Sequence, residues 1–179
     1  SRSPMKRMPT LFAILCLSVA TVACSAGGGD QKLTVLPDLT AAPELDLETP
    51  AGERIRLSNF LGKPVIVNFW ATWCPPCRAE MPSFQRAWDQ IRDEGISLIA
   101  VNVGEDADTI RQFIERVPVT FPLPMDLESR VVQDWPVRGL PTTFVVDPQG
   151  RLVYVATGER EWDDASLLDR VRALLKDAE

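Results

Sequence analysis

The sequence predicts an α/β fold in which a central mixed β-sheet is flanked by helices on both faces. Apolar runs typical of buried strands alternate along the chain with segments of helical periodicity, as expected for a sheet covered on both sides. Near the C-terminus, a turn signal at residues 147–150 joins two strands into a hairpin and adds an antiparallel edge. The predicted order is strand, strand, helix, strand, helix, short helix, strand, strand, helix.

Five segments have the composition of strands. The first covers residues 54–57, where apolar and basic side chains alternate after a turn. Residues 65–70 and 96–103 are nearly continuous apolar runs, which indicates strands buried on both faces. Residues 142–146 and 152–155 are the two strands of the hairpin.

Four segments have the periodicity of helices. The first follows the 65–70 strand and carries apolar side chains on one face as far as Ile91. Residues 110–117 place apolar side chains at i, i+3, i+4 and i+7 and are closed by a proline. A shorter helix is predicted at 127–134, and the last one covers 163–176 with a leucine-rich face.

Composition and charge narrow the classes of function. A chain of 179 residues that is 45% apolar and 25% charged fits one globular domain with a short appendage. The formal net charge of −6 argues against a nucleic-acid partner, which would require many phosphate-neutralising cations. The chain contains no histidine, which excludes Ser-His and Cys-His nucleophile pairs and His-ligated metals.

The first 24 residues have the pattern of a targeting segment. Lys6 and Arg7 precede an uncharged apolar run at 11–23, which is short for a membrane span but suits a secretory signal. The run ends in a small residue followed by Cys24, which resembles a bacterial lipobox with cleavage before an acylated cysteine. The alternative is ordinary signal cleavage nearby. We therefore expect residues 1–24 to be a signal peptide of lipoprotein type.

The mature chain is expected to consist of a tether and one domain. Residues 25–36 are small and polar with a glycine triplet, which is typical of a flexible linker. Residues 37–179 form the expected domain. Because Cys16 leaves with the signal and Cys24 is expected to be acylated, Cys74 and Cys77 are the two cysteines left for chemistry.

Cys74 and Cys77 lie at a predicted strand-to-helix junction and could form a metal half-site or a redox dithiol. A zinc site would need a second pair of ligands, and the mature chain has no further Cys or His, so no metal is predicted. At a helix N-terminus, unpaired N–H groups and the helix dipole favour the Cys74 thiolate. Cys77, one turn later, can attack a mixed disulfide. Two prolines between them remove two donors to the Cys74 sulfur, which favours a reductant.

Residues 68–82, Asn-Phe-Trp-Ala-Thr-Trp-Cys-Pro-Pro-Cys-Arg-Ala-Glu-Met-Pro, resemble the TlpA/ResA-like group of the thioredoxin superfamily. Asn68, Glu80-x-Pro82 and the sequence Gly-Leu-Pro-Thr-Thr-Phe at 139–144 match this group too. The resemblance runs from about Pro37 to the end. It implies a thioredoxin-like fold with an N-terminal strand extension and a central insert, in a group of extracytoplasmic, usually membrane-tethered thiol–disulfide oxidoreductases.

The resemblance implies a role for each matching residue. Cys74 would be the attacking thiol and Cys77 the resolving one, with Glu80 near them to tune or relay protons. Pro141 would be a cis proline facing the disulfide, and the backbone of Leu140 would pair with an extended substrate. The alternatives are a solvated helix charge for Glu80 and an ordinary strand-edge proline for Pro141.

Two tryptophans adjoin the expected site. Trp73 and Trp70 could shield the sulfurs, and we expect Trp73 to contact substrate. The alternative is that both pack in the core, as aromatic side chains beside a buried strand commonly do.

The expected function is reduction of disulfides in exported proteins, without a bound cofactor. The resemblance implies a membrane thiol transporter as the electron source, apocytochrome c as one plausible substrate, and a lipid-anchored location on the periplasmic or extracytoplasmic face of a bacterial membrane. A thiol peroxidase is an alternative, since Thr72 and Arg78 flank the cysteines. A copper-delivery protein is a further alternative, because thiolates bind Cu(I).

Overall fold

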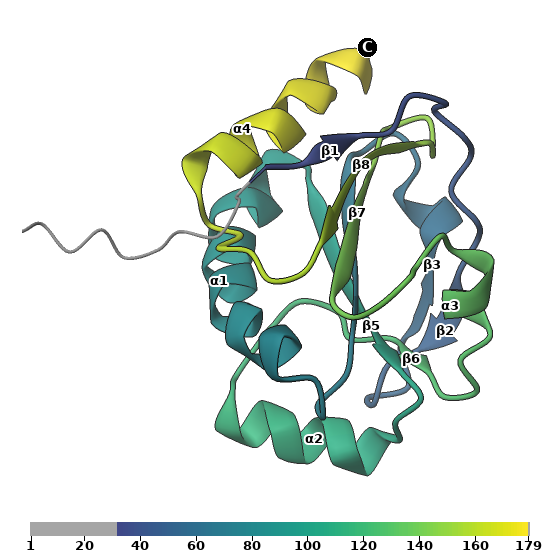
Figure 1. Cartoon of the computed structure of the whole chain (residues 1–179), viewed down its shortest axis with the longest axis vertical. Coiled ribbons are helices and arrows are strands. Elements are labelled where there is room, and N and C mark those ends of the chain that lie inside the picture. Colours follow the sequence, from purple (N-terminus) through teal and green to yellow (C-terminus); the bar gives the residue numbers. More distant parts are fainter. Residues whose placement is uncertain (1–31, 179) are drawn as a thin grey trace, which may run out of the picture.

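The structure, a computed structural model, describes residues 32–178 and has a six-stranded sheet at its centre (Figure 1). The strands in spatial order are β1 (Thr34–Val35), β8 (Leu152–Thr157), β7 (Thr142–Val146), β4 (Val65–Trp70), β5 (Ser97–Val103) and β6 (Met125–Asp126). Strand β4 runs parallel to β5 and antiparallel to β7, while β8 pairs antiparallel with both β7 and β1. The mixed sheet with an antiparallel C-terminal edge is therefore confirmed.

The central strand β4 is buried along its whole length because both faces of the sheet are covered. Its side chains alternate between two hydrophobic clusters, as the period of a strand requires. Ile66 and Trp70 belong to one cluster, and Val65, Val67 and Phe69 to the other. This two-sided burial explains why the segment reads as a continuous apolar run in the sequence.

The two faces of the sheet are covered unequally (Figure 1). Helices α1 (Pro75–Ile91), α2 (Ala107–Arg116) and α4 (Ala165–Ala173) contribute buried side chains to the cluster that contains Trp70. The opposite face is covered by the short helix α3 (Val131–Asp134), the hairpin of β2 (Asp46–Glu48) and β3 (Arg54–Arg56), and the 3-10 helix η1 (Leu57–Phe60). Helices on both faces are confirmed, but the three longer ones share one side.

The domain starts earlier than the sequence indicates. Thr34 and Val35, which fall in the expected 25–36 tether, pair with Val155 and Tyr154 of β8. Leu33 is buried, and its carbonyl accepts a hydrogen bond from Arg170 Nη1 at 2.7 Å. The boundary at Pro37 is therefore corrected, since two strand residues are too few to produce a periodic pattern. The signal segment and the rest of the tether lie outside the described residues.

The central insert also contains structure that the sequence does not predict. Strand β6 pairs in parallel with β5, and the buried Asp126 at its end accepts hydrogen bonds from the backbone N–H groups of residues 130–132. These bonds hold a turn before α3, which explains why that helix starts at Val131 rather than at 127. The final helix likewise ends at Ala173 and continues as the 3-10 helix η3 (Leu174–Ala178).

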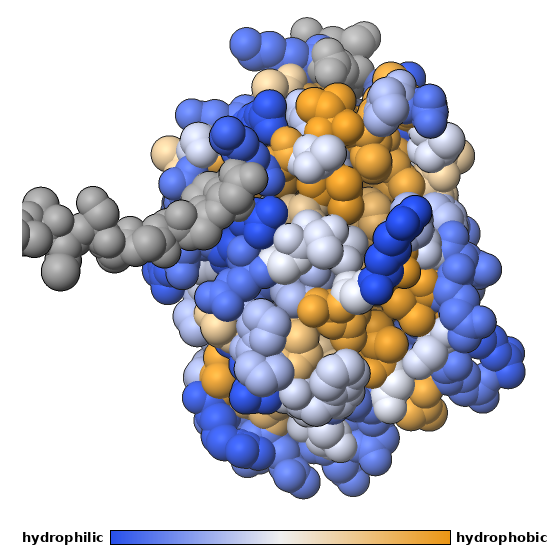
Figure 2. Space-filling view, in the orientation of Figure 1, coloured by the Kyte–Doolittle hydropathy of each residue, from blue (hydrophilic) through white to orange (hydrophobic). Residues whose placement is uncertain are grey.

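The surface mixes charged and apolar side chains. On the face shown in Figure 2, hydrophobic patches lie between hydrophilic residues. Across residues 32–178, none of the helices combines the length and the apolar character needed to cross a membrane.

The contribution of β1 can be tested by shortening the chain. A chain that begins at Pro37 loses the buried Leu33 side chain, the pairing of β1, and the hydrogen bond from Leu36 N to Val153 O at 2.8 Å. We expect its free energy of unfolding to fall by about 2–4 kcal/mol relative to a chain that begins at Lys32, measured in urea. Equal unfolding midpoints and slopes for the two chains would show that β1 is not part of the folded unit.

Candidate active site

The junction between β4 and α1 positions the two cysteines. Strand β4 ends at Trp70, and a tight turn brings the N–H of Cys74 to the carbonyl of Ala71 at 3.2 Å. Cys74 has an extended backbone and is the N-cap of α1, with its carbonyl accepting from Arg78 N at 3.1 Å. The sulfur of Cys74 therefore lies at the positive end of the helix dipole, as predicted.

Cys74 and Cys77 are joined by a disulfide, with their Cα atoms 5.3 Å apart. Cys77 is fully buried and Cys74 is 3% exposed. Because Pro75 and Pro76 carry no N–H, the first backbone donor of the helix is Cys77 N, which donates to Cys74 Sγ at 3.4 Å. Cys74 Sγ thus receives one backbone hydrogen bond, whereas a helix without these prolines would have further N–H groups near the sulfur.

The two tryptophans before the disulfide have different environments. Trp73 is 65% exposed and lies directly before Cys74. Trp70 is fully buried, packs against Phe113 with ring centroids 5.0 Å apart, and donates from Nε1 to Ala100 O at 3.2 Å. Trp70 is therefore a core residue, whereas the Trp73 side chain is exposed to solvent beside the Cys74–Cys77 pair.

The turn before Cys74 is fixed by a carboxylate from the next loop of the sheet. Glu105 accepts from Thr72 N at 2.8 Å and from Thr72 Oγ1 at 2.5 Å, and also from Asn102 Nδ2 at 2.7 Å. On the other side, Arg78 Nη1 donates to Thr72 O at 2.8 Å. Every polar group of Thr72 is thus bonded, which restrains the chain next to Trp73 and Cys74.

Glu80 is a buried carboxyl group one turn beyond Cys77. The i, i+3 spacing on α1 puts the two side chains on neighbouring positions of one helix face. Oε1 accepts from Asn68 Nδ2 at 2.9 Å, and Oε2 accepts from Trp162 Nε1 at 3.1 Å and from Arg160 N at 3.3 Å. Glu80 is fully buried, so it is not the solvated helix charge that the sequence left open.

Burial raises the pKa of Glu80 from its ordinary value to about 8. The hydrogen bonds from Trp162, Arg160 and Asn68 lower this pKa, but desolvation exceeds them, and the nearby Glu159 raises it further. No cation lies within salt-bridge distance of Glu80 among residues 32–178. At neutral pH the carboxyl group is therefore mainly protonated.

Asn68 links Glu80 to the sheet. It lies opposite Thr143 in the β4–β7 pairing, and its Nδ2 donates to Thr143 Oγ1 at 2.9 Å as well as to Glu80. Its Oδ1 is buried without a hydrogen-bond partner. The amide nitrogen is thus satisfied, but the amide oxygen is not.

The Leu140–Pro141 peptide bond is cis. Pro141 is buried, and its carbonyl accepts from Gly158 N at 2.9 Å. The partly buried Leu140 packs against both hydrophobic clusters, one of which contains Cys74 and Cys77. Because Thr142 pairs with Phe69 near the end of β4, the loop before β7 lies at the end of the sheet that carries the Cys74–Cys77 disulfide, the redox end.

Comparison with known proteins identifies the family. A model of the AhpC/TSA family matches residues 39–155. The thiol-disulfide oxidoreductase ResA of Bacillus subtilis (strain 168) is 35% identical over 152 residues, which cover 85% of this chain and 83% of that protein. The chain belongs to the AhpC/TSA family and is a ResA-like thiol–disulfide oxidoreductase.

Solved structures with similar names share the fold. A thiol:disulfide interchange protein of the thioredoxin family from Chlorobium tepidum TLS superposes with a TM-score of 0.65 at 28% identity, covering 78% of this chain and 95% of its own. The thioredoxin-like fold expected from residues 68–82 is therefore confirmed.

Sequence reasoning missed three parts of this ResA-like site. Trp162 and the backbone of Arg160 bind Glu80 from about 80 positions away, and Trp162 also stacks on Phe84 with ring centroids 4.8 Å apart. Glu105 holds Thr72 across 33 positions. None of the three lies in a local motif. The only sequence signal for them is Trp162, a tryptophan in an otherwise polar loop. The expected acylation site Cys24 lies outside the described residues.

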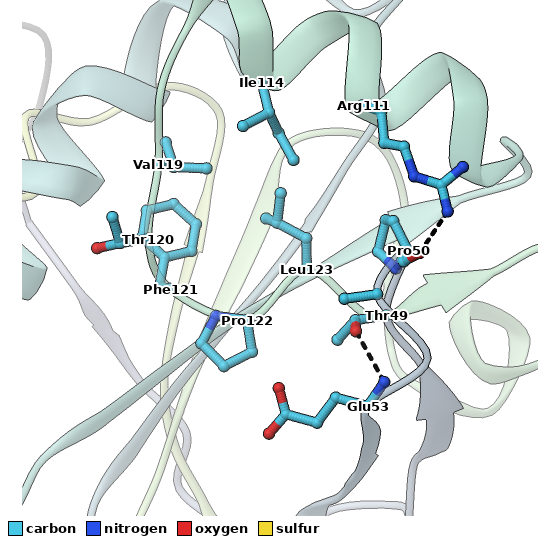
Figure 3. Close-up of a pocket in the computed structure, with 11 residues that line it drawn as sticks. Thr49, Pro50, Glu53, Arg111, Ile114, Val119, Thr120, Phe121, Pro122 and Leu123 are labelled. Atoms are coloured by element: carbon cyan, nitrogen blue, oxygen red, sulfur yellow. Dashed lines mark hydrogen bonds between the residues drawn. The ribbon is translucent and has the colours of Figure 1, made fainter.

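A pocket of about 330 Å³ lies between the turn after β2, helix α2 and residues 119–123 (Figure 3). Ile114, Phe121 and Leu123 form its apolar wall, and Arg111 Nη2 closes one side by donating to Pro50 O at 2.5 Å. None of the residues assigned to the redox site lines this pocket.

The raised pKa of Glu80 predicts how stability depends on pH. Folding raises the pKa of this acid from near 4.5 to about 8, so the folded state holds an extra proton between these values. Stability contributed by the protonated group is complete below pH 4.5 and is lost as the pH rises towards 8. We expect Glu80→Gln to remove this dependence and to raise the free energy of unfolding at pH 7 by roughly 3 kcal/mol.

The measurement is urea unfolding at several pH values between 5 and 8. Glu115→Gln, which changes an exposed carboxylate on α2, is the matched control and should keep the wild-type slope. A wild-type stability that does not fall across this range would refute the buried-acid description.

Proposed function

We propose that this protein reduces disulfides in exported polypeptides through its Cys74–Cys77 dithiol. The observation that carries the proposal is the pair itself, two cysteines one turn apart at the start of α1 and joined in a disulfide, in a chain of ResA-like sequence. This disulfide is the product of the proposed reaction, and its reduced form is the reagent.

The reaction needs two displacements at sulfur. The Cys74 thiolate attacks one sulfur of the substrate disulfide, which forms a mixed disulfide and expels the first substrate thiolate. The Cys77 thiolate then attacks Cys74 Sγ, which closes the Cys74–Cys77 bond and expels the second substrate thiolate. Two electrons pass from the protein to the substrate, and each expelled thiolate takes up one proton.

The environment of Cys74 supports the reducing direction. A disulfide exchanger becomes more oxidising as its thiolate form is stabilised. Because Pro75 and Pro76 lack N–H groups, Cys74 Sγ receives one backbone hydrogen bond, from Cys77. Weak stabilisation of the thiolate favours formation of the disulfide and so makes the dithiol a better reductant.

In this proposal Glu80 exchanges protons with the resolving thiol. A pKa of about 8 lies near the working pH, which suits a group that accepts and returns a proton. Cys77 is fully buried and must lose its proton before it attacks, and Glu80 is one turn away on the same helix face. Rotation of the Asn68 amide would turn its unpaired oxygen towards protonated Glu80, so both protonation states have a partner.

Substrate contact is assigned to the exposed surface around the disulfide. Trp73 offers a large, 65% exposed aromatic surface next to Cys74. An extended substrate segment would pair with the backbone of Leu140 beside the cis Pro141, in the manner of strand addition. The residues on either side of the substrate cysteines would then lie across Trp73.

The site of action is proposed to be the extracytoplasmic face of a bacterial membrane. The apolar run at 11–23 followed by Cys24 supports a lipid anchor. Electrons would come from a membrane thiol transporter, and apocytochrome c is a candidate substrate because its haem-binding cysteines must be reduced.

The peroxidase alternative is not favoured by the geometry. It requires a threonine and an arginine that support the reactive cysteine. Thr72 N and Thr72 Oγ1 both donate to Glu105, so the threonine hydroxyl is directed away from Cys74. A copper-delivery role is not favoured either, because the chain has no histidine to complete a site with the two thiolates.

The order of attack can be tested by trapping the intermediate. With Cys77→Ser, the reduced protein should attack a peptide disulfide through Cys74 and stop at a stable mixed disulfide, because no resolving thiol remains. With Cys74→Ser, the buried Cys77 should give little adduct. Intact-protein mass spectrometry distinguishes the two results. Equal amounts of adduct from both variants would contradict the assigned roles.

A further inference from the structure

A cleft of about 440 Å³ opens beside the redox pair, between the start of α1 and helix α2. Thr72 and Arg78, which line one wall, lie two residues before Cys74 and one residue after Cys77. The other wall includes Thr109, Gln112 and Arg116, which share one face of α2 at i, i+3 and i+7. A group bound in this cleft would therefore be close to a substrate disulfide at Cys74.

The cleft is lined by two arginines that lack an acidic partner. Arg78 Nη1 donates to Thr72 O at 2.8 Å, and Arg116 Nε donates to Gln112 O at 3.1 Å. Within the described chain, neither guanidinium has a carboxylate within 4.0 Å, whereas eight other arginines do: Arg54, Arg56, Arg86, Arg92, Arg111, Arg130, Arg151 and Arg172. Arg138, Arg160 and Arg170 also have no carboxylate within 4.0 Å among residues 32–178, but they do not line this cleft.

The carboxylates near the cleft accept hydrogen bonds from groups other than Arg78 and Arg116. Glu105 accepts three hydrogen bonds from Thr72 and Asn102. On α2, Asp106 caps the helix by accepting from Thr109 N at 2.8 Å, and Asp108 pairs with Arg111 at 2.7 Å. Further round the site, the exposed Arg138 two residues before Leu140 also lacks a carboxylate partner among residues 32–178. Among residues 32–178, no carboxylate forms an ion pair with Arg78, Arg116 or Arg138, so their remaining N–H groups can bind an incoming carboxylate.

We propose that this cleft binds acidic side chains that flank the disulfide of the substrate polypeptide. Each guanidinium has five N–H donors in a planar fork that matches a carboxylate, and each spends one on a backbone carbonyl. The Thr109 hydroxyl and the Gln112 amide can add hydrogen bonds to the same carboxylate. This inference rests on the proposed reduction of polypeptide disulfides. It adds that the preferred substrates carry acidic residues beside the disulfide.

The net negative charge of the protein would direct an acidic substrate towards the exposed arginines. An acidic polypeptide is repelled by a protein of net negative charge except where positive charge is exposed, so the arginines would orient its approach towards Cys74. The pocket in Figure 3 offers no such attraction, because its Arg111 is already paired with Asp108 and its wall is apolar. Since Arg78 and Arg116 are exposed, the effect should appear in the rate of attack and should be screened by salt.

The test uses the reduced protein and two synthetic peptides with the same internal disulfide. One peptide carries Asp and Glu beside its cysteines, and the other carries Lys at the same positions. The second-order rate constant for each is measured by stopped flow at low ionic strength. For the wild-type protein we expect the acidic peptide to react about fivefold faster or more, and the preference to vanish in roughly 1 M salt.

Arg116→Glu should lower the ratio of the two rate constants by about fivefold or more, and Arg116→Gln by less. Lys63→Glu is the matched control, since it makes the same change of net charge at an exposed residue before β4 and should leave the ratio unchanged. A wild-type protein that reduces both peptides equally would overturn this inference but leave the proposed function intact. Failure to reduce either peptide would instead overturn the proposed function.

Discussion

The buried carboxyl group of Glu80 connects the helix that carries Cys74 and Cys77 to the rest of the molecule. It joins helix α1 to the central strand through Asn68 and to the segment before α4 through Arg160 and Trp162. Two other buried carboxyl groups have different partners. Asp126 accepts hydrogen bonds from three backbone N–H groups, and Asp147 forms an ion pair with Arg151 at 2.7 Å. Glu80 accepts three hydrogen bonds and has no ion pair among residues 32–178, and burial raises its pKa to about 8.

This arrangement costs stability at neutral pH, and the proposed proton exchange with Cys77 would give the buried carboxyl group a role. The pKa of a catalytic acid or base is most effective near the working pH, and such values are reached by desolvation near functional sites. Hydrogen bonds from Trp162, Arg160 and Asn68 lower the pKa of Glu80, while burial raises it by more. The protonated form therefore dominates at neutral pH. The rigid support comes from the sheet, since Asn68 and Thr143 are directly paired neighbours on β4 and β7.

Much of the fold and the redox pair could be predicted from the sequence because their signals are local. The run at Val65–Trp70 reports a strand with both faces covered, and the Cys-Pro-Pro-Cys spacing reports a helix start with two sulfurs one turn apart. Strands β1, β2 and β6 have two or three residues each, which is too short for a periodic pattern. The partners of Glu80 and Thr72 are remote in sequence, and the arginine-lined cleft arises only when α2 packs near the start of α1.

The reduction potential of the Cys74–Cys77 pair tests whether this dithiol is a reductant. The purified protein would be equilibrated with thiol–disulfide buffers of known potential, and the fraction of the disulfide measured at each. A potential near that of thioredoxin, about −270 mV, is the predicted result for a pair whose sulfur receives one backbone hydrogen bond. A potential near about −120 mV would identify a disulfide donor and would refute the reducing direction.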